Sequence, residues 1–307
     1  MGKDEPGTPK LVPHQPSTLA RATSFEPLID STMRYFDRLA LKPYEHKVET
    51  GMQFGEQVKY VSWQIPESKV GREIELMQIT DVQFGHRGCR VDRVIEYRDW
   101  VLAKKNRFML WTGDNVDAWA LWSPGTAWDQ IADPQSQVFK FCELWAPARH
   151  RILGYVGGNH ERRAIPGFGD LGILIATLLR IPYSGGRQHV DVHYGKHTPF
   201  RISLWHGTGG ARTKGTVAQG LARFMEQGDS QLYLTGHVHQ PLIIPTWKEV
   251  RDTENKRITL RKSIGVVGSS FMETYGTYAE VAGYTGGDVL MGNARLEANG
   301  KWEVSLR

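Results

Sequence analysis

The chain has few cysteines, no long apolar run and no large excess of one charge. Its two cysteines, Cys89 and Cys142, are too few for a disulfide framework. No apolar stretch is long enough to span a bilayer, and the N-terminal residues MGKDEPGTPKLVPHQPS lack the apolar core of a signal peptide. These absences predict a cytoplasmic protein that is not inserted in a membrane.

The charge balance is mildly basic. The chain has 38 Lys and Arg against 33 Asp and Glu, a net charge of +5. This excess permits a polyanionic partner without requiring one, and an ordinary mildly basic enzyme accounts for it equally well. A hydrophobic content of 40% and a charged content of 23% are typical of a globular protein.

The N-terminal segment differs in composition from the rest of the chain. Residues 1 to 20 are rich in Pro, Ser, Thr and Lys, which predicts a weakly ordered tail. Residues 24 to 41 carry apolar residues at helical spacing and predict a helix docked on the main domain. We therefore expect a partly disordered extension over residues 1–50, with one helix, and one domain over residues 51–307.

Strand-like and helix-like segments alternate through the middle of the chain. Strands are predicted at 59–66, 73–80, 107–114, 151–159, 200–207 and 231–237, and helices at 91–104, 135–146, 170–180 and 215–227. This alternation predicts a mostly parallel sheet covered on both faces. After residue 240 the segments are all strand-like, and Asn299-Gly300 is a hairpin signal, so the C-terminal part adds antiparallel strands.

Polar side chains with oxygen or nitrogen donor atoms follow five of these strands. In open α/β sheets, ligands collect at the carboxyl ends of the strands. Each fragment alone is more often a turn, a helix cap or a satisfied histidine, but their joint occurrence indicates a metal site. The residues at the strand ends are Asp81 and Gln83; Asp114 and Asp117; Asn159, His160 and Glu161; His206; and His237 and His239.

The ligand types indicate which metals fit. Carboxylates, amide oxygens and imidazoles form a mixed oxygen and nitrogen set, which suits Mn, Fe, Zn or Mg rather than a thiolate-bound structural zinc. A central carboxylate can bridge two such ions. Two ions about 3.5–4 Å apart form a clamp for in-line displacement at phosphorus. Glycines beside the ligands, at 113, 158 and 236, suit a backbone that approaches a site closely.

The order of these motifs resembles the calcineurin-like metallophosphoesterase superfamily. The pattern D-x-(H), GD-x-x-D, GNHE, H, GHVH runs in family order over residues 73 to 240. The resemblance implies a four-layer α/β/β/α sandwich with central mixed β-sheets and a site for two divalent metal ions. We expect Mn there, ahead of Mg, Fe or Zn. The resemblance also implies hydrolysis of a phosphate ester by attack of a metal-bound hydroxide at a dinuclear site.

The resemblance assigns roles residue by residue. Asp81, Asp114 and His239 would hold metal one. Asp114 would bridge to metal two, which Asn159, His206 and His237 would also hold. His160 would protonate the leaving oxygen or bind the phosphoryl group. Asp117 would orient His160, since a carboxylate fixes an imidazole's tautomer and supports its charged form.

The sequence departs from this pattern at one position. The family usually has His two residues after the first Asp, where this chain has Gln83. Gln83 could donate its amide oxygen to metal one, which favours Mn or Mg over Zn. Alternatively, His86 replaces it as the ligand, or metal one is lost or transiently bound. We favour the amide ligand, because all the other ligands persist.

The substrate is less clearly indicated. Arg162 and Arg163 follow GNHE and could bind a second phosphate or a nucleic-acid backbone. Arg212 and Lys214 lie in a Gly-rich loop, which either binds phosphate or is a solvated connection. His86 is a further substrate-binding candidate.

Trp119 and Trp122 could stack on a base or pack as a lid. The first hypothesis is therefore a phosphodiesterase or nuclease acting on DNA, RNA or a nucleotide. The alternatives are a phosphomonoesterase on a small or protein substrate, and a non-catalytic binding protein with a degenerate site.

Overall fold

The computed structural model describes residues 57–307 except 198, 211–212, 278–279, 281–282 and 284–286. The predicted helix at 24–41 and the tail before it lie outside this range. No helix in the described part of the chain combines the length and the apolar character needed to cross a membrane. Cys89 and Cys142 are both free thiols.

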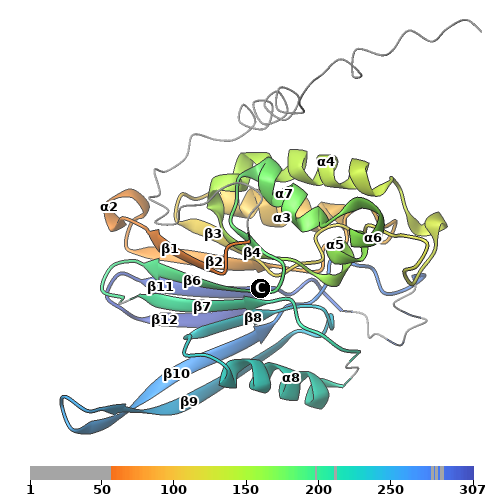
Figure 1. The fold of residues 1–307 in the computed structure, drawn as a ribbon. Coiled ribbons are helices and arrows are strands. Elements are labelled where there is room, and N and C mark those ends of the chain that lie inside the picture. Colours follow the sequence, from red (N-terminus) through yellow and green to blue (C-terminus); the bar gives the residue numbers. More distant parts are fainter. Residues whose placement is uncertain (1–56, 198, 211–212, 278–279, 281–282, 284–286) are drawn as a thin grey trace, which may run out of the picture.

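Two six-stranded sheets stack face to face at the centre of the molecule (Figure 1). The first sheet has the order β1 (Tyr60–Gln64), β6 (Arg187–His193), β7 (Phe200–Trp205), β8 (Leu232–Thr235), β10 (Arg257–Val267) and β9 (Leu242–Asp252). The second has the order β12 (Trp302–Leu306), β11 (Gly292–Glu297), β2 (Glu73–Ile79), β3 (Arg107–Trp111), β4 (Ile152–Val156) and β5 (Tyr183–Ser184).

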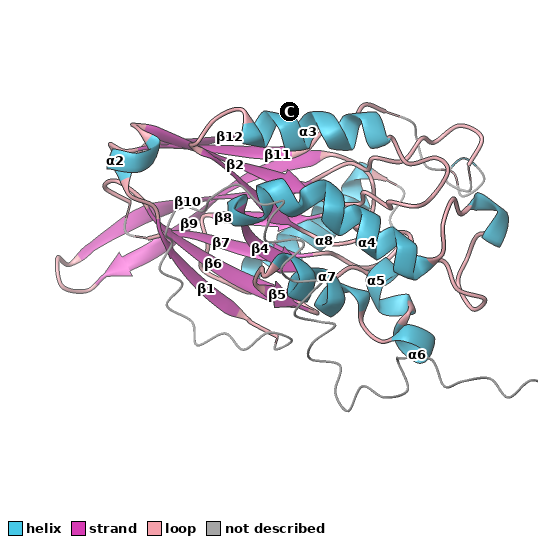
Figure 2. Ribbon diagram, turned by 90° about the horizontal axis from the view of Figure 1, so that it is seen from above, coloured by secondary structure: helices cyan, strands magenta, loops and turns pink. Residues whose placement is uncertain are grey.

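Helices cover the outer face of each sheet (Figures 1 and 2). On the β2–β3–β4 sheet lie α3 (Val91–Leu102), α4 (Pro134–Trp145) and α7 (Leu171–Leu179), and on the other sheet lies α8 (Lys214–Glu226). The shorter helices are α2 (Glu67–Val70), α5 (Asn159–Arg163) and α6 (Ile165–Phe168), with 3₁₀ turns at Ala127–Asp129 and Ala146–Arg151.

Apolar residues fill each of the three spaces between these four layers. Val190, Leu204 and Leu234 from one sheet pack with Leu76 and Leu110 from the other. Separate clusters lie between the second sheet and α3, α4 and α7, and between the first sheet and α8. All five residues of β3 are buried because both faces of its sheet are covered. The predicted four-layer sandwich is therefore confirmed.

The single sheet covered on both faces, which the alternation of elements predicted, is wrong. Each sheet has helices on its outer face and the other sheet on its inner face. The strands at 59–66 and 73–80 are adjacent in sequence, yet β1 pairs with β6 and β2 pairs with β3 and β11. The predicted antiparallel additions are present, because β9 pairs with β10 and β12 with β11.

Candidate metal centre

Strand ends from both sheets meet at one edge of the sandwich. Asp81, Asp114 and Asn159 follow β2, β3 and β4 of one sheet. His206 follows β7 of the other sheet, and His237 follows β8. Parallel strands place their carboxyl ends at a common edge, and the facing sheets bring two such edges together.

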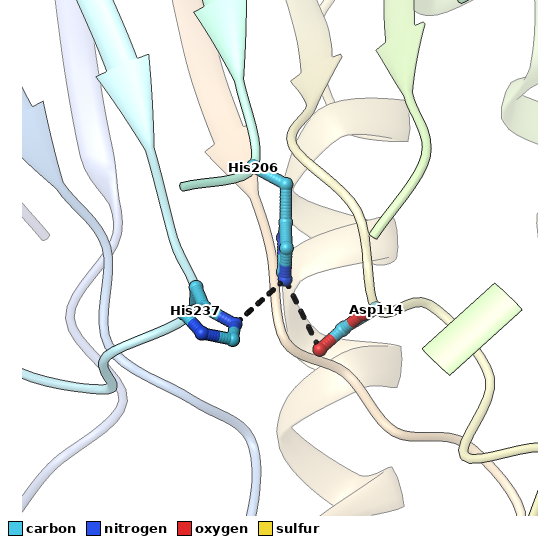
Figure 3. Close-up of side chains that lie close together, drawn as sticks. All are labelled: Asp114, His206 and His237. Atoms are coloured by element: carbon cyan, nitrogen blue, oxygen red, sulfur yellow. Dashed lines mark hydrogen bonds and ion pairs between the residues drawn. The ribbon is translucent and has the colours of Figure 1, made fainter. Parts of the chain in front are cut away.

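Three side chains from three strand ends converge most closely (Figure 3). One ligand atom from each of Asp114, His206 and His237 lies within 4.8 Å of the others. His206 Nε2 is 3.2 Å from Asp114 Oδ2 and 3.2 Å from His237 Nδ1. The side-chain oxygen of Asn159 lies 3.0 Å from the same nitrogen. These four residues are those that the resemblance assigns to metal two.

The tautomer of His206 indicates what this cluster would bind. Its Nδ1 is 2.7 Å from the carbonyl oxygen of Thr112, which can only accept a hydrogen bond. The Nδ1 proton is therefore fixed there, so that when the ring is neutral, as in a metal ligand, its lone pair lies on Nε2, facing two oxygens and a nitrogen. Such a convergence of acceptors fits a cation.

The charges at the cluster lead to the same conclusion. Burial lowers the pKa of His206, but the carboxylate of Asp114, together with Asp81, outweighs burial and raises the pKa to about 10. For Asp114, burial raises the pKa, and the neighbouring His160 and His206 outweigh it and hold the pKa well below its usual range. The buried carboxylates therefore favour positive charge at this point.

Asp81, His239 and Gln83 form a second group beside the first. Asp81 Oδ1 is buried, and its one close partner among the described residues is His239 Nε2, 3.2 Å away. The amide end of Gln83 lies 3.4 Å from the same imidazole nitrogen. Asp81 Oδ2 accepts from the N–H of His237 at 2.8 Å, which joins the two groups. The donor set fits metal one.

The backbone is held in an unusual conformation at these ligands. Asp81, Gln83, Asp114, His237 and His239 are five of the eight non-glycine residues with positive φ in the described chain. This left-handed region costs energy for residues other than glycine and clusters at functional sites.

The packing also requires glycine beside two of the ligands. A Cβ at position 158 would lie 2.0 Å from Asp114 Oδ1, and one at position 236 would lie 2.3 Å from Asp81 Oδ2.

His160 and Asp117 form a pair beside Asp114. His160 Nδ1 is 3.0 Å from Asp117 Oδ1, and His160 Nε2 is 3.7 Å from Asp114 Oδ2. Arg163 Nη2 also contacts His160 Nδ1 and lies 3.3 Å from Asp117 Oδ1. Asp117 is thus a buried carboxylate shared between two basic groups, and Gln130 donates to its other oxygen at 2.6 Å.

A cleft of about 330 Å³ opens over the metal ligands. His86, Arg163, Trp119 and Trp122 are among the residues that line it. The indole N–H of Trp122 donates to the carbonyl oxygen of Arg163 at 2.7 Å, which fixes this ring at the cleft edge.

Two predicted substrate residues lie away from this cleft. Arg162 donates to the carbonyl oxygen of Gly185 at 3.2 Å and lines another cavity. Lys214 is the exposed first residue of α8 and is not part of the cleft lining. Arg212 lies outside the described residues.

Glu161 is a structural residue of the centre for which the sequence predicted no role. Its carboxylate accepts from the backbone N–H groups of Asp114, Asn115 and Gly158 at 2.7–3.0 Å and from the hydroxyl of Tyr155 at 3.0 Å. Burial, followed by the charge of Asp114, raises its pKa. The feature of the sequence that could have indicated this role is the position of Glu161 directly after His160 in the GNHE motif.

Comparisons with known proteins bear on the fold. No family model and no curated protein matches the chain. A solved metallophosphoesterase from Sphaerobacter thermophilus is similar to it, with 15% identity, a TM-score of 0.38, and coverage of 76% of this chain and 87% of that one. A Bacillus subtilis calcineurin-like phosphoesterase, YfkN, has 9% identity, a TM-score of 0.36, and coverage of 77% and 90%.

A serine/threonine phosphatase from Saccharomyces cerevisiae is also similar, with 10% identity, a TM-score of 0.38, and coverage of 92% of this chain and 89% of that one. The two facing six-stranded sheets, with helices on their outer faces, have the four-layer arrangement that the predicted resemblance implies.

Proposed function

We propose that the chain is a metal-dependent phosphodiesterase acting on nucleic acid or a nucleotide. The observation that carries the proposal is the convergence of Asp81, Asp114, Asn159 and three histidines at two adjoining points, with His160 and Asp117 beside them. Two divalent cations held at these points, Mn by preference, would polarise the phosphoryl oxygens and make bound water acidic.

His160 is placed to supply the proton for the leaving oxygen. Its Nδ1 faces Asp117 Oδ1 at 3.0 Å, so the carboxylate orients the ring. Its Nε2 faces the cleft near Asp114. A proton on Nε2 is thus available to an oxygen bound over the metal ligands, and Asp117 acts as the positioning residue.

The charge of the cleft favours a diester over a monoester. Arg163 is the one Lys or Arg among the described lining residues, and Asp117 shares its charge. A phosphodiester carries one negative charge, whereas a phosphomonoester carries close to two near neutral pH. Trp119 and Trp122 on the rim suit a flat ring, such as a nucleobase, attached to the phosphate.

The test compares bis-p-nitrophenyl phosphate with p-nitrophenyl phosphate in Mn²⁺. We expect the diester to have the higher kcat/KM. Asp114→Asn should abolish turnover together with metal binding, measured by elemental analysis. Retained activity would refute the dinuclear site, and preference for the monoester would replace the proposal with a phosphomonoesterase.

His160→Ala should lower kcat about 10²–10⁴-fold while the metal is retained, as expected for the loss of a general acid. Loss of metal in this variant would mean that His160 is a ligand. Absence of both metal and activity in the wild type would favour the non-catalytic binding protein.

A further inference from the structure

A second cavity, of about 500 Å³, is lined by basic residues that the cleft does not use. Lys59, Arg162, Arg187 and His189 line it around the Gly185–Gly186 turn between β5 and β6. The acidic lining residue is Asp170, which caps α7 through the N–H of Gly172 and accepts from the hydroxyl of Tyr183 at 2.9 Å. Its partners are neutral donors, so the described lining carries this one carboxylate against Lys59, Arg162 and Arg187.

This cavity is linked to the metal centre through two elements of the fold, α5 and the β6–β7 pair. Arg162 lies two residues after His160 on α5. Arg187 lies opposite Trp205 in the β6–β7 ladder, and the ligand His206 follows Trp205. Both arginines therefore belong to chain segments that also carry residues of the metal centre, at the same edge of the sheets.

The two arginines have neutral partners in the described chain. Arg162 donates to a backbone carbonyl at 3.2 Å. Arg187 bonds the side-chain oxygen of Gln227 and stacks over the rings of Trp205 and Phe224, at 5.1 and 5.3 Å. These contacts hold the side chain in place without neutralising its charge.

Arg187 also lines a third cavity, of about 390 Å³, so the basic lining continues beyond one pocket. This cavity contains Arg223 of α8 and the Gly207–Gly210 segment that follows His206. We name Lys59, Arg162, Arg187 and Arg223 the basic track. We propose that the basic track binds the sugar–phosphate backbone of a single strand of nucleic acid whose scissile phosphate lies at the metal centre.

This inference rests on the proposed function and narrows its substrate to a polymer. A mononucleotide has no phosphates that could occupy cavities outside the cleft. A strand carries one negative charge per nucleotide at regular spacing, which suits separate cations spread along two cavities that share Arg187 as a lining residue. The aromatic rim of the cleft, Trp119 and Trp122, provides stacking surfaces of the kind that such proteins combine with a basic groove.

The test measures binding of a fluorescein-labelled single-stranded DNA of roughly 20 nucleotides by anisotropy, with chelator present, over a range of salt concentrations. Lys59→Gln with Arg187→Gln should weaken binding about ten-fold and make the plot of log Kd against log salt shallower by about 1.4, or 0.7 per lost phosphate contact. The matched control, Lys104→Gln with Lys105→Gln, removes the same charge just before β3, at the opposite ends of the strands. It should bind like the wild type.

Arg223→Gln provides a second variant on the exposed side of α8 and should weaken binding in the same direction. Wild-type affinity in both the double variant and Arg223→Gln would overturn the inference. So would full displacement of the oligonucleotide by equimolar mononucleotide.

Binding measured with chelator present does not require turnover, so either proposal can be refuted while the other stands. In Mn²⁺, the double variant should lose at least ten-fold more kcat/KM on the oligonucleotide than on bis-p-nitrophenyl phosphate. Salt-dependent binding through the basic track in a protein that cleaves no diester would refute the proposed function alone. Equal losses on both substrates would overturn the basic track.

Discussion

At the residue scale, Gln83 places an amide where the family resemblance implies an imidazole. The side chain is buried, and its amide end lies 3.4 Å from His239 Nε2. An amide can present its oxygen to the same point by turning over. His86 instead uses Nδ1 to accept the N–H of Gly88 at 2.9 Å, and burial lowers its pKa. This geometry supports Gln83, rather than His86, as the ligand.

Gln83→His should tighten the binding of metal one, the ion that the Gln83 amide would hold. Imidazole is a stronger ligand than an amide oxygen for late divalent ions, and we expect about ten-fold higher Zn²⁺ affinity, or about 1.4 kcal/mol. Calorimetric titration of the metal-free protein measures it, with His86→Ala as the control that should leave the affinity unchanged. An unchanged affinity in Gln83→His would show that the amide does not occupy a ligand position.

Arg162 and Arg163 are adjacent in sequence, but their side chains point to different parts of the molecule. Arg163 turns to Asp117 in the cleft and Arg162 turns to Gly185 outside it. Successive residues of a helix point about 100° apart, so one of two adjacent arginines can face the site while the other does not. In the sequence both arginines simply follow GNHE, and nothing there shows that α5 begins at Asn159. The sequence therefore could not predict that only Arg163 faces the cleft.

At the element scale, α5 fixes the loops that carry two of the ligands. Glu161, in the first turn of α5, accepts hydrogen bonds from the backbone N–H groups of Asp114 and Asn115 after β3 and of Gly158 after β4. The sequence predicted where these strands lie, because a buried strand is a local apolar run, but it extended β3 and β4 three residues too far. It missed β6, RQHVDVH, because one face of this strand is exposed and its polar residues mask the pattern.

Glu161→Ala should lower the free energy of unfolding by about 3 kcal/mol or more, because it leaves several buried donors without a partner. Urea denaturation of the metal-free protein measures this change. Glu226→Ala, at the exposed end of α8, is the matched control and should stay within about 0.5 kcal/mol of the wild type. A neutral result for Glu161→Ala would mean that the loops hold their shape without its carboxylate.

At the scale of the whole molecule, the ligands are divided between the two sheets. Asp81, Asp114 and Asn159 follow strands of one sheet, and the three histidines follow strands of the other. This division could not be predicted from local patterns, because strand partners are far apart in sequence. Tyr60, for example, pairs with His189. Only the family resemblance indicated two sheets.

Removing metal should therefore destabilise the whole domain and not merely one loop. A ligand at 100 times its dissociation constant stabilises the folded state by about 2.7 kcal/mol, so chelation should lower Tm by several degrees. Differential scanning calorimetry with and without Mn²⁺ measures this. Asp114→Asn should show little metal-dependent change. A wild-type Tm that changes with neither chelator nor Mn²⁺ would contradict metal binding across the two sheets.

The left-handed backbone at five of the candidate ligands affects the choice of substitutions at these positions. Asparagine and aspartate tolerate this conformation better than alanine or a β-branched residue does. An alanine at Asp81 or Asp114 would thus remove a ligand and add conformational strain at once. Asparagine at the same positions separates coordination from folding, whereas a conventional alanine scan would overstate what each carboxylate contributes to metal affinity.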